Sequence, residues 1–255
     1  MTKLFLALLP LLAFAATIPA AETPLTAHPG YGIAQEPGSP GMPGGPALAA
    51  APRPEEDGLV APAGMPPFGK WMYTSLLKRA NWLGVPYKGK TLYEPVNIII
   101  VDAYAKNTKE ALARLLTAAH KAGFPARWGH STGYQAFIAD AFTTQVKGKK
   151  HHAFSDAAWS KANNHGRIFG PVLFDGKYWF AAAFSRQSVS LLRKVRHRYV
   201  SFNEARDKFA LAMNNATAYK VSRLIEMENA LTGPGMESAG DHDGLAVFLE
   251  TVETP

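Results

Sequence analysis

The sequence predicts an α+β fold in which two main helices pack on one face of a mixed β-sheet, around a split βαβ-like core with additions. Three observations lead to this fold class. One apolar run has the composition of a buried strand, two segments combine helical periodicity with capping residues, and a strong hairpin turn lies between those two segments. The order strand, helix, two hairpin strands, helix, strand is that of a split βαβ arrangement.

The chain opens with the features of a secretory signal peptide over residues 1–21. Lys3 precedes an apolar run over residues 4–16, and the small residues Ala20 and Ala21 close the segment. The run is shorter than the roughly 20 residues that a membrane span needs, and no comparable run follows. We therefore expect an exported protein, periplasmic or extracellular, with no transmembrane segment in the mature chain.

Residues 22–67 form a leader rich in proline, glycine and alanine, with 11 prolines and 8 glycines. Such a composition buries too little apolar surface to offset the entropy of ordering. We expect a disordered leader, followed by one folded domain over residues 68–252, which is close to the length of a single domain.

The first element expected in the domain is a short amphipathic helix over residues 68–83. Trp71, Leu76 and Trp82 are its expected packing residues. Gly84 and Pro86 would end the helix, because neither residue continues helical structure well.

Residues 96–101 form a strand that is expected to be covered on both faces, because nearly every position is apolar and most are β-branched. A helix is expected next. Asn107 is its N-cap and Glu110, three residues later, supplies the reciprocal carboxylate. Gly123 supplies the C-terminal stop. The expected buried stripe consists of Leu112, Leu115, Leu116 and Ala119.

Asp175 and Gly176 lie between two apolar runs and predict a tight hairpin, because a type I′ turn needs positive φ at both central residues. If these two residues form the loop, Phe174 faces Lys177, and counting back along both strands places His165 opposite Arg186.

This register predicts that His165, Arg167 and Arg186 lie on one face at the open end of the hairpin. An alternative stays open at Pro171, which cannot donate to the ladder. A bulge there would shift the register by one residue and undo this inference.

A short strand over residues 196–200 is expected to lead into the second helix, where Ser201 and Glu204 have capping-box spacing. Helical phase places Arg206 in an apolar stripe, so its guanidinium needs a partner or a path to water; an ion pair with Asp102 would satisfy both groups. The stripe consists of Phe202, Arg206, Phe209 and Met213. The last two strands are expected over residues 219–227 and 245–251.

Composition narrows the classes of function. With 27 Lys and Arg against 20 Asp and Glu, the formal net charge is +7, which favours an anionic small molecule or lipid head group as partner. The positive residues are too scattered to indicate nucleic-acid binding, and no nucleic-acid motif is present. Since there is no cysteine, disulfide scaffolds, thiol nucleophiles and thiolate metal sites are excluded. Nothing in the sequence indicates an oligomeric state.

Histidine and arginine are concentrated between residues 151 and 206. Arginines beside an imidazole suit phosphate or carboxylate recognition and proton transfer, so His165 and His197 are the candidate catalytic residues. The alternative is that these side chains only hold the fold together. The loop 129–134, which contains His130, is a candidate binding loop. We predict ligand contacts from Arg167, Arg186, Arg206, His130 and Asp102.

The sequence lacks the motifs of several common enzyme classes. There is no G-x-S-x-G elbow, no P-loop lysine pattern and no H-E-x-x-H. The adjacent His151 and His152 would point to opposite faces of a strand, so we expect no metal site and no cofactor.

The stretch 92–249 resembles the LssY-like C-terminal domain family of bacteria, whose activity is not established. The resemblance is carried by residues 95–100 before a helix that ends in Ala122-Gly123-Phe124, by residues 196–201 with 205–207 following, and by residues 240–245. Ala205 stands where the family has an acid. Such domains often occur beside membrane phosphatase domains, but this chain has no Pro-Ser-Gly-His signature, so the resemblance implies no phosphatase catalysis here.

The sequence thus favours an exported, envelope-associated accessory protein that binds an anionic, phosphate-bearing ligand. The alternative is a hydrolase acting on phosphoesters or acyl esters, with His165 or His197 as acid or base. A third hypothesis is a structural module without a ligand.

Overall fold

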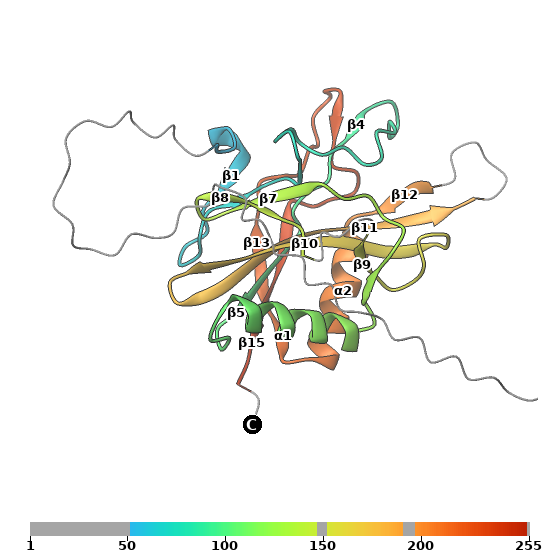
Figure 1. Cartoon of the computed structure of the whole chain (residues 1–255). Coiled ribbons are helices and arrows are strands. Elements are labelled where there is room, and N and C mark those ends of the chain that lie inside the picture. Colours follow the sequence, from blue (N-terminus) through green and yellow to red (C-terminus); the bar gives the residue numbers. More distant parts are fainter. Residues whose placement is uncertain (1–51, 147–151, 191–196, 254–255) are drawn as a thin grey trace, which may run out of the picture. The chain divides into compact units, whose positions relative to one another are not determined.

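The computed structural model describes residues 52–146, 152–190 and 197–253 (Figure 1). The expected signal peptide, most of the expected leader, and His151 and Arg196 lie outside these residues.

The described chain contains two α-helices and many short strands. In chain order the elements are η1 (Glu56–Gly58), β1 (Leu59–Val60), β2 (Phe68–Gly69), β3 (Tyr73–Thr74), β4 (Thr91–Leu92), β5 (Ile98–Asp102), α1 (Thr108–Lys121), β6 (Ala126–Arg127), β7 (Tyr134–Ile138), β8 (Ala141–Thr144), β9 (Ala153–Ser155), β10 (Asn163–Phe174), β11 (Lys177–Val189), β12 (His197–Ser201), α2 (Asn203–Ala216), β13 (Tyr219–Glu226), β14 (Glu237–Ser238) and β15 (Leu245–Thr251).

The larger sheet is mixed and has the strand order β13-β15-β5-β11-β10-β9-β6. Strand β12 pairs with the C-terminal end of β11. Both neighbours of β11 in this order, β5 and β10, are antiparallel to it. They are therefore parallel to each other, with α1 between them in the chain and β11 between them in space. This is the split βαβ unit that the sequence predicted, and the α+β fold class is confirmed.

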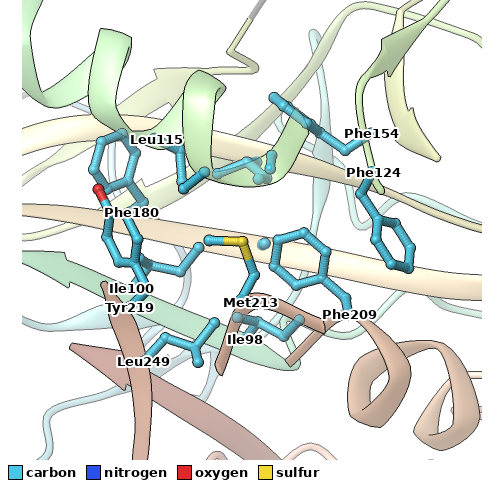
Figure 2. Close-up of a cluster of buried hydrophobic side chains, with 14 of the residues drawn as sticks. Ile98, Ile100, Leu115, Phe124, Phe154, Phe180, Phe209, Met213, Tyr219 and Leu249 are labelled. Atoms are coloured by element: carbon cyan, nitrogen blue, oxygen red, sulfur yellow. The ribbon is translucent and has the colours of Figure 1, made fainter. Parts of the chain in front are cut away.

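The central strands β5 and β11 of the larger sheet are buried on both faces, and their successive side chains point to opposite sides. On one face, Ile98, Ile100 and Phe180 pack with both helices, as Figure 2 shows for Leu115 of α1 and Phe209 of α2. On the other face, Ile99 and Trp179 pack against the smaller sheet. The apolar run at residues 96–101 thus has the two-sided burial that its composition predicted.

Both helix starts follow from their capping residues. Asn107 Oδ1 accepts from the Glu110 backbone N–H at 2.9 Å, and Glu110 Oε2 accepts from the Lys106 N–H at 3.0 Å, one residue before the expected donor. Ser201 Oγ accepts from the Glu204 N–H at 2.8 Å. None of the helices in the described ranges is long and apolar enough to cross a bilayer.

The expected helix over residues 68–83 is wrong. The segment is extended, with β2 and β3 in the smaller sheet β1-β2-β7-β3, which β8 extends by pairing with β7. Trp71 and Trp82 are buried as expected, whereas Leu76 is 77% exposed. The physical reason is that Trp71, Met72 and Tyr73 are buried in succession, which no single helix face allows. Tyr73 also pairs with Gln135, which is far along the chain.

The folded part also begins before residue 68. Strand β1 pairs with β2, the Lys70 N–H donates to the Gly58 carbonyl at 2.9 Å, and Met65 is buried. The expected boundary was too late, because the high proline content of residues 52–67 does not prevent short extended pairing at a sheet edge.

The predicted hairpin turn is confirmed. Asp175 and Gly176 have φ values of 48° and 70°, and Phe174 pairs with Lys177. Both central residues therefore adopt the left-handed conformation of a type I′ turn.

The expected register holds only near this turn. The pairing shifts between Phe169 and Val172, so His165 lies opposite Ser185 and Arg186 lies opposite Asn164. Pro171 has no N–H for the ladder, and the bulge at this point moves every later pair by one residue. His165 and Arg186 consequently point to opposite faces of the sheet, and the expected pairing of the two is wrong.

Candidate functional site

A small polar pocket lies where the loop between β6 and β7 meets one end of β10, β11 and β12. Its volume is about 100 Å³. We call it the histidine pocket; its polar and aromatic lining consists of Trp82, Glu94, His130, Ser131, Trp159, His165, Arg167, Gln187 and His197. The structure thus brings together four of the residues that the sequence singled out, namely His130, His165, Arg167 and His197.

His165 is held through both ring nitrogens. Its Nδ1 lies 2.8 Å from Asn163 Oδ1, and the Asn163 amide nitrogen donates to two backbone carbonyls, so Nδ1–H is the donor. Its Nε2 faces Ser185 Oγ at 3.5 Å, and Trp82 Nε1 donates to the same hydroxyl at 3.3 Å. Burial, with Arg167 nearby, lowers the pKa of His165 well below its ordinary value.

The order Ser185, His165, Asn163 matches nucleophile, base and orienting group in a hydrolase. Ser185 is only 1% exposed, however, and it does not line the pocket. The chain of contacts therefore fixes the imidazole in one orientation and presents no nucleophile to the pocket.

Arg167 ties the candidate binding loop to β10. Its Nη2 donates to Ser131 Oγ at 2.7 Å and its Nε to the Ser131 carbonyl at 3.3 Å, while the guanidinium carbon lies 4.6 Å from the centre of the Tyr134 ring. Arg167 is 4% exposed, so the pocket contains a fixed and largely desolvated positive charge.

Glu94 is the buried carboxyl group of the pocket. Its Oε2 lies 3.7 Å from Arg167 Nη1, longer than a hydrogen bond. Burial raises the pKa of Glu94, and the charge of Arg167 only partly opposes this rise. The group therefore takes up a proton more readily than an exposed glutamate does.

His130 has a ring nitrogen without a partner. Its ring stacks on His165, with centroids 4.8 Å apart and planes at 28°. Nε2 is buried without a hydrogen-bond partner, although the side chain lines the pocket. Burial, then the charges of Arg167 and His197, lower the pKa of His130 to about 4, so the ring is neutral near pH 7.

The loop that carries His130 approaches its neighbours closely. Gly129 has a φ of 106°, and a Cβ on it would lie 2.0 Å from Cδ1 of Trp159. Only glycine fits here, so the indole and the loop backbone are in direct contact. His197 stacks on the same indole, at 5.7 Å and 27°, and its Nδ1 lies 3.1 Å from Gln187 Oε1.

A larger cleft adjoins the pocket. Its volume is about 690 Å³, and Trp82 and His197 line both cavities. The cleft is lined by Val85, Pro86, Tyr87, Leu92 and Tyr199, with the cationic residues Lys88 and Arg198.

Three residues expected at the site lie elsewhere. Arg186 points to the helix face of the sheet and pairs with Glu204. Asp102 does not bind Arg206; its Oδ2 accepts from Arg114 Nε at 2.6 Å and from the Tyr219 hydroxyl at 2.9 Å. The expected ion pair between Asp102 and Arg206 and the expected position of Arg186 beside His165 are wrong, because periodicity along the sequence gives the face of a strand or helix but not its partners in space.

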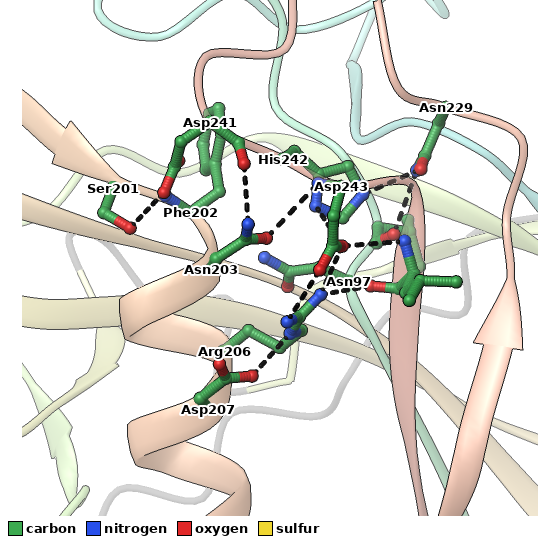
Figure 3. Close-up of polar contacts among 12 residues, drawn as sticks. Asn97, Ser201, Phe202, Asn203, Arg206, Asp207, Asn229, Asp241, His242 and Asp243 are labelled. Atoms are coloured by element: carbon green, nitrogen blue, oxygen red, sulfur yellow. Dashed lines mark hydrogen bonds and ion pairs between the residues drawn. The ribbon is translucent and has the colours of Figure 1, made fainter.

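Arg206 is buried on the inner face of α2, as its phase predicted, but its partners are acids that the sequence did not indicate. Its Nη1 and Nη2 contact both carboxylate oxygens of Asp243, at 2.6 and 3.1 Å, and its Nε donates to Asp207 at 2.7 Å (Figure 3). All of these contacts are internal, so Arg206 stabilises the fold and is not part of the histidine pocket.

Sequence reasoning missed Glu94, Trp82 and Trp159. Glu94 is a single acid beside an apolar strand, and the two tryptophans carry no signal beyond general burial. Only Asn163, close to His165 in sequence, could have been suggested as a ring partner. In the described ranges, no group of three or more His, Asp or Glu side chains is arranged to hold a metal ion.

Comparison of the chain with protein-family models, curated proteins and solved structures finds no match in any of the three. The interpretation of the site therefore depends on its own geometry.

Proposed function

We propose that this protein binds an anionic, phosphate-bearing ligand with the anion in the histidine pocket. The observation that carries the proposal is the pairing of a buried guanidinium, Arg167, with a buried imidazole nitrogen, His130 Nε2, that has no partner, in one small cavity. A buried polar atom without a partner costs free energy, which a ligand that bonds to it recovers.

Protonation of Glu94 and His130 favours an anion in the histidine pocket. A phosphate oxygen near Arg167 competes with Glu94 for the positive charge, which promotes protonation of the already perturbed Glu94 carboxyl group. The protonated carboxyl donates a hydrogen bond to the anion in place of repelling it. Negative charge also favours protonation of His130, which then donates through Nε2.

Titration calorimetry with inorganic phosphate at pH 6 tests the proposal. The wild type is expected to bind. Arg167→Gln and His130→Asn are expected to weaken binding about tenfold or more, since each removes one charged or charge-assisted contact. Arg223→Gln, an exposed residue outside the pocket, is the matched control and keeps wild-type affinity. No binding by the wild type, or equal binding by folded pocket variants, contradicts the proposal.

A second candidate function is hydrolysis of phosphoesters or acyl esters. Glu94 has a raised pKa and His130 a lowered one, and groups shifted in opposite directions suit an acid and a base. His130 fits the role of base better than the expected His165 and His197, because its Nε2 has no partner. His130 would take a proton from water as the water oxygen bonds to phosphorus or acyl carbon, and Glu94 would protonate the leaving oxygen as the ester bond breaks.

A screen of alkyl and aryl phosphoesters and acyl esters separates hydrolysis from binding. Turnover that is lost in both His130→Asn and Glu94→Gln, with unchanged thermal unfolding, supports hydrolysis. Binding of the same esters without turnover excludes the hydrolase.

Export to the cell envelope and kinship with the LssY-like domains also remain proposals. Export is supported by the apolar run and small residues of positions 1–21, and the kinship by the quoted motifs and the split βαβ core. Recovery of the processed protein from a periplasmic or culture fraction, with an N-terminus near residue 22, tests export.

A further inference from the structure

We propose that the ligand is a phosphate ester whose carbon portion carries a ring, and that this ring binds in the cleft beside the histidine pocket. This inference rests on the proposed function, since it assumes that the phosphate occupies the pocket. It assigns the larger cavity to the ester's carbon portion and so names the substrate class of the site.

The sizes of the two cavities support a ligand in two parts. The histidine pocket, at about 100 Å³, offers the space of roughly three water molecules, counting ~30 Å³ for each. That space suits one phosphate group and is smaller than the cavity of about 150 Å³ that holds a benzene ring. The cleft, at about 690 Å³, is in the range of small-molecule sites. Because Trp82 and His197 line both, the two cavities are neighbours, and our proposal places the phosphate in the pocket and the carbon portion beyond these two side chains in the cleft.

One wall of the cleft consists of aromatic rings held against one another. The Tyr199 ring meets Trp82 at 5.9 Å and 75°, and Tyr87 at 4.9 Å and 76°. The wall is anchored in a separate apolar cluster with Leu92 and Phe202, so the rings are fixed before a ligand arrives. Tyr87 and Tyr199 are only half-buried, which leaves ring surface in the cleft for contact with a flat ligand.

The charges around the cleft favour a ligand with negative charge. Lys88 and Arg198 line it and are exposed, and Lys88 Nζ lies 5.2 Å from the centre of the Tyr87 ring. A cation held over an aromatic ring at a cleft entrance attracts anions while the ring contacts the apolar portion. Neutral aromatic compounds would gain only the second of these interactions.

Calorimetric titration with a series of phosphates tests the inference on the full chain. The probes are inorganic phosphate, methyl phosphate, a hexose phosphate and phenyl phosphate. We expect at least one ring-bearing ester to bind about tenfold or more tightly than methyl phosphate, and the stronger of the two identifies the ring type as sugar or aryl. Equal affinity for methyl, hexose and phenyl phosphate overturns the inference and leaves the proposed function standing. No binding of any probe overturns both.

Substitutions at Tyr87 locate the ring. Tyr87→Leu is expected to abolish the preference for the ring-bearing ester and to leave affinity for methyl phosphate unchanged. Tyr87→Phe keeps the ring and is expected to keep the preference, which controls for disturbance of the fold. The matched control is Tyr104→Leu, the same change at an exposed tyrosine outside the cleft. Full preference in a folded Tyr87→Leu variant overturns the assignment of the cleft.

Discussion

His242 shows how one buried ring can make stability depend on pH. Its Nε2–H donates to Asn229 Oδ1 at 2.7 Å, while Nδ1 is buried without a hydrogen bond, 3.9 Å from Asp243 (Figure 3). Burial, which Asp243 and Asp241 oppose and Arg206 reinforces, lowers the pKa of His242 from 6.5 to about 4. Between these two pH values the unfolded chain binds the proton and the folded chain does not, so stability falls as the pH falls.

We expect His242→Gln to reduce this loss of stability. Glutamine retains an N–H donor for Asn229 and does not titrate, so the decline in unfolding free energy between about pH 6.5 and pH 4 should shrink by at most about 3 kcal/mol. Denaturant unfolding at several pH values measures it. The pKa of His130 is also lowered in the folded protein, so part of the decline in stability remains in the variant. The exposed His120→Gln is the control, and an identical pH profile for His242→Gln and wild type would refute the assignment.

The raised pKa of Glu94 predicts how the affinity for phosphate depends on pH. Above its raised pKa the ionised carboxylate repels an anion in the histidine pocket, and below that pKa the neutral acid does not. The ratio of wild-type to Glu94→Gln affinity for phosphate should therefore be higher at pH 6 than at pH 8, a comparison in which the protonation of phosphate itself cancels. Glu94→Gln should bind phosphate about threefold to tenfold more tightly than wild type at pH 8, with a flatter pH dependence. Calorimetry at both pH values decides, and weaker binding by the variant at pH 8 would show that the carboxylate assists the anion.

At the level of elements, periodicity and capping predicted α1, α2, β5, β15 and the hairpin turn, because these depend on neighbouring residues. Predicting the site also required the strand register and the placement of loops. The His165–Arg167 face was predicted from strand alternation, but Arg186 was lost from it because a bulge of one residue inverts every later side chain. His130 and Glu94 reach the pocket from loops and short strands, whose placement is set by tertiary contacts that no local pattern encodes.

The hydrogen bonds at the start of α2 allow the contribution of one helix cap to stability to be tested. Ser201 Oγ accepts from the Glu204 N–H at 2.8 Å and donates to Asp241 Oδ2 at 2.5 Å. Burial raises the pKa of Asp241, but bonds from Ser201, Tyr199 and the Phe202 N–H outweigh it and lower the pKa. The Ser201 hydroxyl is therefore one of several groups that join the start of α2 to the loop at Asp241.

Ser201→Ala should lower the unfolding free energy by about 1–2 kcal/mol, because it removes a helix cap and a hydrogen bond to a charged group. Thermal and denaturant unfolding measure the change. Thr117→Ala, at an exposed position inside α1, is the comparison and should be neutral or slightly stabilising, since alanine is the better helix former. Equal stability of both variants would mean that Ser201 does not cap α2.

For the molecule as a whole, the larger sheet has a helix layer on one face and the smaller sheet on the other, and the histidine pocket lies where the loop from β6 to β7 passes from the larger sheet to the smaller one. The smaller sheet was not predicted, because its strands are two to five residues long and β2 and β3 pair with β7, a distant part of the chain. Its integrity should therefore matter for both stability and ligand binding.

The contribution of residues 52–67 tests this dependence. A chain that begins at residue 68 lacks β1, the Lys70–Gly58 backbone bond and the buried Met65. Burying a methionine contributes about 1.5–3 kcal/mol, so we expect a loss of about 2 kcal/mol relative to a chain that begins at residue 52. At roughly 2–4 °C for each kcal/mol in a domain of this size, the melting temperature should fall by about 4–8 °C. Calorimetric melting of the two chains measures it; equal melting temperatures would mean that the fold is complete from residue 68 onward.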